Sequence, residues 1–228
     1  MAESVERRTD NTDRPQIITI TSRMFAINTY IVYLPGRTDC IVVDPGFDTS
    51  RIIDKLFELR LTPAAILNTH GHVDHIFGNA ALKKEWPRCP LVIGADEEDK
   101  LTDPYKNLSG LYGTPVVSPP ADTLVHHGET YSAAGLDFLT LSAPGHSSGH
   151  VVFVWRGESP WFVLGGDVLF QGSVGRTDFP DGDFDQLREA IHSHLFPLPA
   201  DTIVYPGHGG ATTIGIERRS NPYVGLDA

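Results

Sequence analysis

The sequence predicts an α+β domain in which two β-sheets pack face to face and helices cover their outer faces. Short strand-like segments, ended by Pro, Gly or Asp, alternate with amphipathic helical segments along the 228 residues. Their order is β–β–β–α–β–α and then β–β–α–β, which suggests two similar halves. Apolar residues make up 40% of the chain, enough for one core. We expect residues 1–14, which are polar and charged, to form a disordered tail and residues 15–228 to form a single domain.

The first half is expected to contain strands at 17–21, 28–34, 40–43, 64–69 and 90–94 and helices at 52–59 and 79–84. The strands are rich in β-branched residues and end at turn residues. The spacing of the first three suggests an antiparallel meander. Apolar residues recur at helical spacing in the first helix, and Thr49 or Ser50 can cap it.

The second half is expected to contain strands at 140–141, 151–155, 161–164 and 202–205 and a helix at 184–194. Between the halves, residues 96–122 are rich in Pro, Gly, Asp and Ser. A segment of this length and composition predicts a long loop or lid.

The net charge and the cysteines limit the classes of function. A formal net charge of -11 repels phosphate backbones and anionic lipids, so we expect neither nucleic-acid nor membrane binding. The two cysteines, Cys40 and Cys89, are too few for a disulfide framework and form no CxxC motif. The N-terminus has no apolar signal core, and no apolar run reaches membrane-spanning length. These features favour a soluble, cytoplasmic protein.

Three histidines and one aspartate lie within six residues directly after the strand at 64–69. The segment is His70-Gly71-His72-Val73-Asp74-His75. Imidazole and carboxylate groups are ligands for zinc, iron and manganese. A segment this short cannot direct all four side chains at one ion without strain. A division of the ligands between two adjacent ions is therefore favoured. Gly71 fits the tight backbone turn that lets neighbouring ligands converge. The alternative is a solvated, His-rich polar loop.

Three more ligand-type side chains follow glycines in turns or after predicted strands: His146, Asp167 and His208. A strand end followed by Gly presents such a side chain at the rim of a sheet. A lone histidine in a turn is more often a solvated turn residue, but three such positions beside the cluster weaken that explanation. We therefore predict a metal site assembled from segments far apart in the sequence.

These segments resemble the metallo-β-lactamase superfamily from about Gln16 to the C-terminus. The resemblance implies a four-layer αββα sandwich, the metallo-β-lactamase fold, with the site at one edge of the sheets. It also implies that His70, His72 and His146 hold a first metal, that Asp74, His75 and His208 hold a second, and that Asp167 bridges them. Asp44, in the turn that ends the third strand, resembles a family residue behind the site and is interpreted as a structural or ligand-supporting residue.

The resemblance further implies a hydrolase with two divalent metal ions per chain. Zinc is expected, and iron and manganese also fit these ligands. Two metals about 3.5–4 Å apart can bind a bridging water and lower its pKa toward about 7, so that the resulting hydroxide is the nucleophile. Asp74 and Asp167 are the expected catalytic residues, because Asp74 would orient this hydroxide and Asp167 would bridge the metals.

A later segment narrows the chemistry. Residues 166–179, which include Gly175-Arg176-Thr177-Asp178-Phe179, resemble the glyoxalase II group, hydrolases of S-2-hydroxyacylglutathione thioesters. Arg176 occupies the place of a basic residue that contacts a carboxylate of the thiol in that group, and a guanidinium suits this role through a bidentate pair. The alternative is a structural arginine. Only 20 residues follow His208, so the chain resembles the short members without the C-terminal helical domain, and the expected partner is a small thioester.

Other activities remain open on this fold. Persulfide dioxygenases resemble the same segment and use one iron, which His70, His146 and Asp167 would hold here. A lactonase or other esterase is a second alternative. A non-catalytic metal-binding module is disfavoured, because the bridged arrangement expected here is open, whereas structural zinc sites are closed and four-coordinate. The remaining histidines are expected to have structural or surface roles: His126, His127, His150, His192 and His194. For His150, an outer role near the metals is also open.

Overall fold

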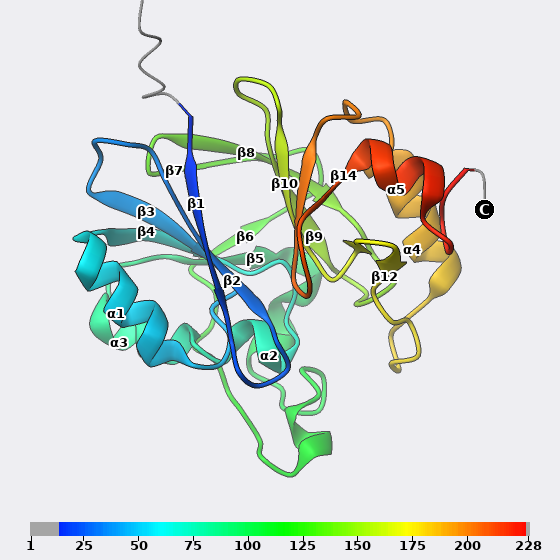
Figure 1. Cartoon of the computed structure of the whole chain (residues 1–228). Helices are drawn as coiled ribbons and strands as arrows, with labels where there is room; N and C mark the ends of the chain where they lie inside the picture. Colours follow the sequence, from blue (N-terminus) through cyan, green and yellow to red (C-terminus); the bar gives the residue numbers. More distant parts are fainter. Residues whose placement is uncertain (1–13, 227–228) are drawn as a thin grey trace, which may run out of the picture.

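Two six-stranded sheets lie face to face in the computed structural model, which describes residues 14–226 (Figure 1). In order across the first sheet, the strands are β1 (Gln16–Thr21), β2 (Asn28–Tyr33), β3 (Asp39–Val43), β4 (Thr62–Leu67), β5 (Leu91–Gly94) and β6 (Thr123–Val125). Across the second they are β14 (Thr212–Thr213), β13 (Ile203–Pro206), β10 (Phe162–Gly166), β9 (Val151–Trp155), β8 (Leu136–Ser142) and β7 (Thr130–Ala133). A separate hairpin consists of β11 (Leu169–Phe170) and β12 (Ser173–Val174).

Helices cover the outer face of each sheet (Figure 1). The first sheet is covered by α1 (Thr49–Leu59) and α3 (Asn79–Glu85), and the second by α4 (Phe184–Ala190), the π-helical turn η3 (Ile191–Leu195) and α5 (Ile214–Ser220). The remaining helices are α2 (Val73–Ile76) and two 3-10 helices, η1 (Ala95–Leu101) and η2 (Ser109–Tyr112). The layers therefore follow the predicted order of helix, sheet, sheet and helix.

Strand alternation explains why these layers form. In β3, Ile41 packs into the core between the sheets, whereas Val42 packs toward α1. In β9, Phe153 packs between the sheets and Val154 packs toward α4. Because both faces of these strands are buried, their sequences are continuous apolar runs and do not alternate with polar residues.

The strands that carry candidate site residues end at the same edge of their sheets. In the first sheet, β3 and β4 are parallel. In the second, β10 is parallel to β13, and β8 and β10 are each antiparallel to β9 and so run in the same direction. Backbone hydrogen bonds join the two sheets at this edge, from Val151 N–H to the Thr69 carbonyl at 2.9 Å and from Asn28 N–H to the Gly207 carbonyl at 2.7 Å.

Some local predictions are wrong. The residue that caps α1 is Asp48, in the left-handed region at φ 59°, and neither Thr49 nor Ser50 takes that place. The Asp48 carboxylate accepts a hydrogen bond from Arg23 N–H at 2.9 Å instead of capping the helix. The strands β6, β7, β11, β12 and β14 and the helix α5 were not predicted, so the strand at 202–205 is not the last one. Most of these elements have two to four residues, which is too short for a periodic pattern.

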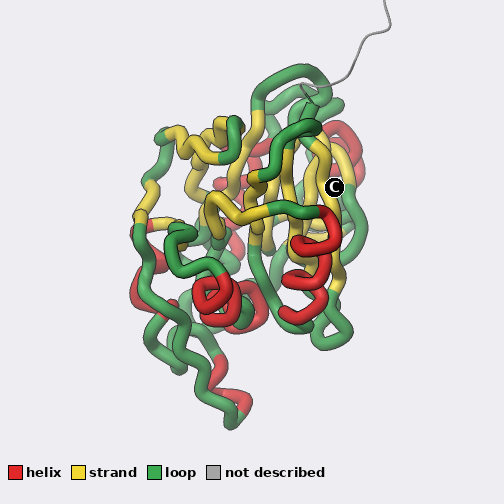
Figure 2. The backbone as a smooth tube through the Cα atoms, turned by 90° about the vertical axis from the view of Figure 1, so that its left-hand side faces the viewer, coloured by secondary structure: helices red, strands yellow, loops and turns green. Residues whose placement is uncertain are grey.

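The segment at 96–122 is more ordered than a loop. It contains most of η1 and all of η2, and Figure 2 shows the part around η2 projecting at the bottom of the view. The side chains of Glu97, Lys100 and Asn107 are buried within it. The segment is therefore a folded and packed part of the domain, and the prediction of a loop or lid is only partly correct.

The predicted tail falls mainly on residues 1–13, which lie outside the described residues. Arg14 is described, and its guanidinium donates hydrogen bonds to the carbonyls of Ser159 and Pro160, each at 3.2 Å. The single domain from 15 to 228 stays a prediction. In the described range, both cysteines are free and buried, and no helix has the length and apolar character needed to cross a membrane.

Candidate metal centre

All seven predicted ligand residues lie at the edge where the two sheets are joined. His70 and His72 follow β4, Asp74 and His75 lie in α2, His146 lies between β8 and β9, Asp167 follows β10, and His208 follows β13. The segment of residues 70–75 is therefore only partly a loop, since its second half is helical. The parallel strand directions bring these distant segments together.

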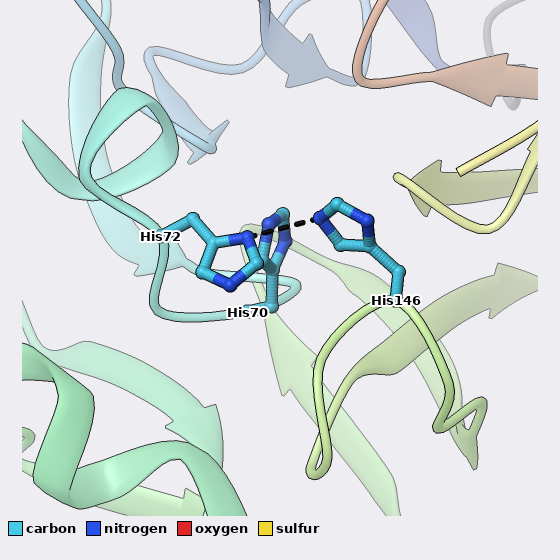
Figure 3. A group of neighbouring side chains, drawn as sticks. All are labelled: His70, His72 and His146. Atoms are coloured by element: carbon cyan, nitrogen blue, oxygen red, sulfur yellow. Dashed lines mark hydrogen bonds between the residues drawn. The ribbon is translucent and has the colours of Figure 1, made fainter. Parts of the chain in front are cut away.

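The ligand atoms form three groups, and within each group they lie within 4.8 Å of one another. The first group is His70, His72 and His146, the second is Asp74, His75 and His208, and the third is His70, His75 and Asp167. The third group takes one member from each of the others and adds Asp167. Figure 3 shows that the rings of His70 and His72 come from one loop and face the His146 ring from another. His72 Nδ1 and His146 Nε2 are 2.9 Å apart.

Asp44 determines which nitrogen of two rings carries the proton. Its Oδ2 accepts hydrogen bonds from His75 Nδ1 at 3.0 Å and from the Thr69 hydroxyl at 2.7 Å. Because this hydroxyl donates to Asp44, its oxygen accepts from His70 Nδ1 at 3.1 Å. In their neutral forms, both rings therefore carry the proton on Nδ1 and present an unprotonated Nε2. Asp44 thus lies behind the site and supports the ligands.

Backbone carbonyls have the same effect on two more rings. His146 Nδ1 donates to the Arg176 carbonyl at 2.8 Å, and His208 Nδ1 donates to the Phe25 carbonyl at 2.9 Å. A carbonyl oxygen can only accept, so each Nδ1 is protonated. The Nε2 atoms face Asp167 Oδ2, at 3.6 Å from His146 and 3.4 Å from His208.

Unpaired polar atoms show that these residues fit a metal. Within residues 14–226, His70 Nε2, His75 Nε2 and Asp167 Oδ1, whose residues form the third group, are buried without a hydrogen-bond partner. An unpaired buried polar atom costs about 1–3 kcal/mol, so such a cluster needs a binding partner. Gly207 leaves room for it, because a Cβ there would lie 2.1 Å from Asp167 Oδ1. Imidazole and carboxylate donors suit zinc, iron or manganese.

The cluster borders an open pocket of about 390 Å³. Apolar side chains from several segments line it, among them Leu108, Phe170 and Phe179. The Phe179 ring packs against the rings of His72 and His146, with centroids 5.1 and 5.7 Å apart. The site is therefore polar at the ligands and apolar at the walls, as expected for a small organic substrate.

Arg176 lies on the wall of this pocket. Its guanidinium forms a bidentate pair with Asp178, with both N–O distances 2.6 Å, and lies 4.4 Å from the centre of the Phe179 ring. Its side chain is 59% exposed. Arg176 is thus placed to meet a ligand in the pocket, with its charge already engaged by a neighbouring carboxylate.

Comparison with known proteins decides the family. Residues 23–208 match the model of the metallo-beta-lactamase superfamily. The chain belongs to this superfamily. It is 36% identical over 212 residues to a Haemophilus influenzae protein named hydroxyacylglutathione hydrolase, with 92% of this chain and 97% of that protein covered. It is also 36% identical to a probable metallo-hydrolase of Bacillus subtilis, with 84% and 90% covered.

Solved structures of the superfamily agree with the fold. The chain is similar to the BLEG-1 B3 metallo-beta-lactamase, with 36% identity and a TM-score of 0.87 over 92% of this chain and 99% of that one. It is also similar to TTHA1623 in a di-iron-bound form, with 32% identity and a TM-score of 0.76 over 90% and 99%. The predicted family and αββα fold are confirmed, and the protein is a metallo-hydrolase of this superfamily with a His/Asp cluster able to bind metal ions.

His150 lies closer to the ligand groups than a structural or surface role would require. Its ring is fully buried and stacks on His70, with centroids 4.6 Å apart. Its Nε2 accepts a hydrogen bond from Asp167 N–H at 3.1 Å, which helps to hold that residue in place. It lies directly before β9, and the outer role near the metals that the sequence left open for it agrees with this position. His192 and His194 instead bond backbone carbonyls outside the ligand groups, in structural roles.

Burial and neighbouring charges divide the histidines into two sets. Burial, with a contribution from His146, lowers the pKa of His72 to about 3, and burial lowers the pKa of His70 well below its usual value. Burial also acts to lower the pKa of His208, but hydrogen bonds to Asp167 and Asp74 outweigh it and raise that pKa to about 10. The pKa of His75 is likewise raised, since Asp74, Asp167 and Asp44 outweigh its burial. In the metal-free protein, His75 and His208 are therefore in their charged forms at neutral pH, with protons on both ring nitrogens.

We expect metal binding at about pH 7 to release these protons, because a ligating nitrogen must be unprotonated. Apparent metal affinity should then fall as the pH is lowered, by up to about tenfold per pH unit for each proton released. Calorimetry in buffers of different ionisation enthalpy measures this release, and His208→Ala should release about one proton fewer. His192→Ala is the control and should match the parent. Equal release by His208→Ala and the parent would contradict this prediction.

Proposed function

We propose that this chain is a binuclear metal-dependent hydrolase of small thioesters, with S-2-hydroxyacylglutathione-type compounds as the substrate class and zinc as the expected metal. The observation that carries the proposal is the pair of complete ligand groups, His70, His72 and His146 beside Asp74, His75 and His208, with Asp167 between them. A single-metal enzyme needs only one of these groups. The relative solved in a di-iron-bound form supports two ions at such a site.

A bound pair of divalent metals would supply an activated water and would polarise the substrate carbonyl. The chain's own residues prepare the site for this chemistry. Asp44, Thr69 and two backbone carbonyls hold four imidazoles with Nε2 facing inward. Asp74 lines the pocket, with Oδ2 3.3 Å from His208 Nε2, where its carboxylate can accept a proton from an attacking water. The apolar walls exclude other water and orient the acyl group.

Two observations favour a thioester over other substrates. The relative named hydroxyacylglutathione hydrolase is covered over 97% of its length, so its name belongs to a protein of similar size without an added domain. Arg176 lies on the pocket wall, where a carboxylate of the thiol would compete with Asp178 for its guanidinium. Both features agree with a carboxylated thiol as the leaving group.

Metal analysis combined with parallel assays tests the proposal. We expect about two metals per chain and hydrolysis of S-lactoylglutathione, with weak or no cleavage of a β-lactam or a lactone. The β-lactam assay tests the activity for which the BLEG-1 relative is named. One iron per chain with oxygen uptake on a persulfide, and no thioester hydrolysis, would replace the proposal with a dioxygenase. Faster lactone cleavage would replace it with a lactonase.

Arg176→Ala is expected to raise KM for S-lactoylglutathione by about tenfold and to leave kcat nearly unchanged, because it removes a binding contact and not a reacting group. The backbone carbonyl that orients His146 remains in this variant. KM for a small neutral thioester should change much less, and steady-state kinetics on both substrates give the comparison. An equal increase for the two substrates would make Arg176 a structural residue.

A further inference from the structure

A buried ion pair in η1 lies between the two loops that carry the first ligand group. Glu97 is fully buried and Lys100 is nearly so, and Lys100 Nζ lies 2.6 Å from Glu97 Oε1. Lys100 also lies 2.6 Å from Asp181 Oδ2 and donates to the hydroxyls of Ser147 and Ser148. So deeply buried a pair is stable only when its remaining hydrogen-bonding positions are filled.

Glu97 fills these positions with donors from both loops. Its Oε2 accepts from Gly71 N–H at 2.7 Å. Its Oε1 accepts from the Ser147 hydroxyl at 2.6 Å and from Gly149 N–H at 2.8 Å, in addition to Lys100. All four partners are donors, so only a group with two acceptor oxygens satisfies them.

The donors stand directly beside metal-ligand candidates. Gly71 separates His70 from His72, and Ser147 follows His146. Glycine is required on both sides, because a Cβ at Gly71 would lie 2.5 Å from Lys100 Cβ, and one at Gly149 would lie 2.5 Å from the Asp96 carbonyl carbon. The turn of η1 therefore packs against both loops at backbone distance.

We propose that Glu97 is a positioning residue that sets the separation of His70 and His72 from His146 and so controls the metal affinity of this first group. The inference rests on the proposed metal site. The second group has other supports, since Asp44 holds His75 and the Phe25 carbonyl holds His208. Loss of the Glu97 carboxylate is therefore expected to weaken one metal position more than the other.

Glu97→Gln tests this with little change in volume. The amide oxygen can replace Oε1 with its three donors, and the NH₂ group then faces the Gly71 N–H. Two donors cannot pair, so the loop of His70 and His72 moves away. We expect the affinity for one of two metals to fall about 10–100-fold. The bound amount then falls from about two metals per chain to about one when the free metal is buffered between the dissociation constants of this position in the parent and in the variant.

Metal content is measured by elemental analysis after equilibration with zinc buffered by a chelator, without reference to activity. In absorption spectra of the cobalt-loaded proteins, the band of the ion at the second group should match the parent. The band of the ion at the first group should be altered. Glu217→Gln is the matched control. Glu217 is also buried and accepts hydrogen bonds from Gly172 N–H, the Thr212 hydroxyl and the Asn221 amide, but it contacts neither ligand loop. It should keep both metals.

The outcomes separate this inference from the proposed function. Two metals of parent affinity and a parent cobalt spectrum in Glu97→Gln would overturn the inference alone, even if the metal-free variant unfolds at a lower temperature. A parent protein that binds no metal would overturn the proposed function and the inference together. If Glu97→Gln does not fold, Ser147→Ala replaces it, because it removes only the hydroxyl between Glu97 and Lys100. It should lose a few-fold in the same metal position, and unchanged affinity would overturn the inference.

Discussion

Asp167→Ala is expected to lose both metals and to lower turnover by at least about 10³-fold. Asp167 lies between the two ligand groups. Its Oδ1 is 3.5 Å from His75 Nε2, and its Oδ2 faces the Nε2 atoms of His208 and His146. The alanine variant would leave two divalent cations close together without the anionic group between them, and their repulsion would disfavour joint binding.

Elemental analysis after gel filtration and initial rates on S-lactoylglutathione measure the effect of Asp167→Ala. Asp178→Ala provides the control for metal content, because Asp178 is an exposed carboxylate near the pocket that pairs with Arg176. It should retain the metals of the parent. Circular dichroism establishes that the Asp167→Ala protein is folded. Metal and turnover at the parent level in this variant would exclude Asp167 from the site.

The layers of the fold were predictable because buried strands and amphipathic helices leave strong local patterns. The run Cys40–Val43 is apolar on both faces, and the structure packs one face between the sheets and the other under α1. The cap of α1 was not predictable in the same way. Asp48 adopts a left-handed backbone conformation and bonds Arg23, 25 residues away in the sequence, so its place depends on tertiary contacts.

The ligand candidates were predictable because they combine unusual residue types with strand ends. Their supports were not, with the exception of Asp44. Glu97 lies in the run Asp96-Glu97-Glu98-Asp99, and nothing local separates it from its exposed neighbours. Its function comes from donors at Gly71, Ser147 and Gly149, which are 26 to 52 residues distant. Such a network becomes visible only when the loops are brought together.

Asp44→Asn is expected to lower metal affinity by about 10–100-fold and turnover by at least as much. The substitution changes one atom of a residue that supports two rings. The amide oxygen can keep the hydrogen bond from Thr69 N–H that Oδ1 accepts at 2.8 Å. The NH₂ group then replaces Oδ2, the acceptor for His75 Nδ1 and for the Thr69 hydroxyl. The neutral His75 ring that a metal requires would then carry its proton on Nε2, which is the ligand atom, because a proton on Nδ1 would face a second donor. The flipped amide is no better, because its NH₂ would face Thr69 N–H.

The backbone keeps this test specific. Asp44 has a φ of 46°, in the left-handed region, and asparagine is one of the residues that tolerates that conformation. Asp48→Asn is the matched control, since Asp48 has a φ of 59° and also accepts a backbone N–H, but it lies at the N-terminal end of α1 and outside the ligand groups. Chelator competition should give parent affinity for Asp48→Asn and weakened affinity for Asp44→Asn, with both proteins folded when metal-free. Parent affinity in Asp44→Asn would mean that the protonated nitrogen of His75 is set by the metal itself and not by the carboxylate behind it.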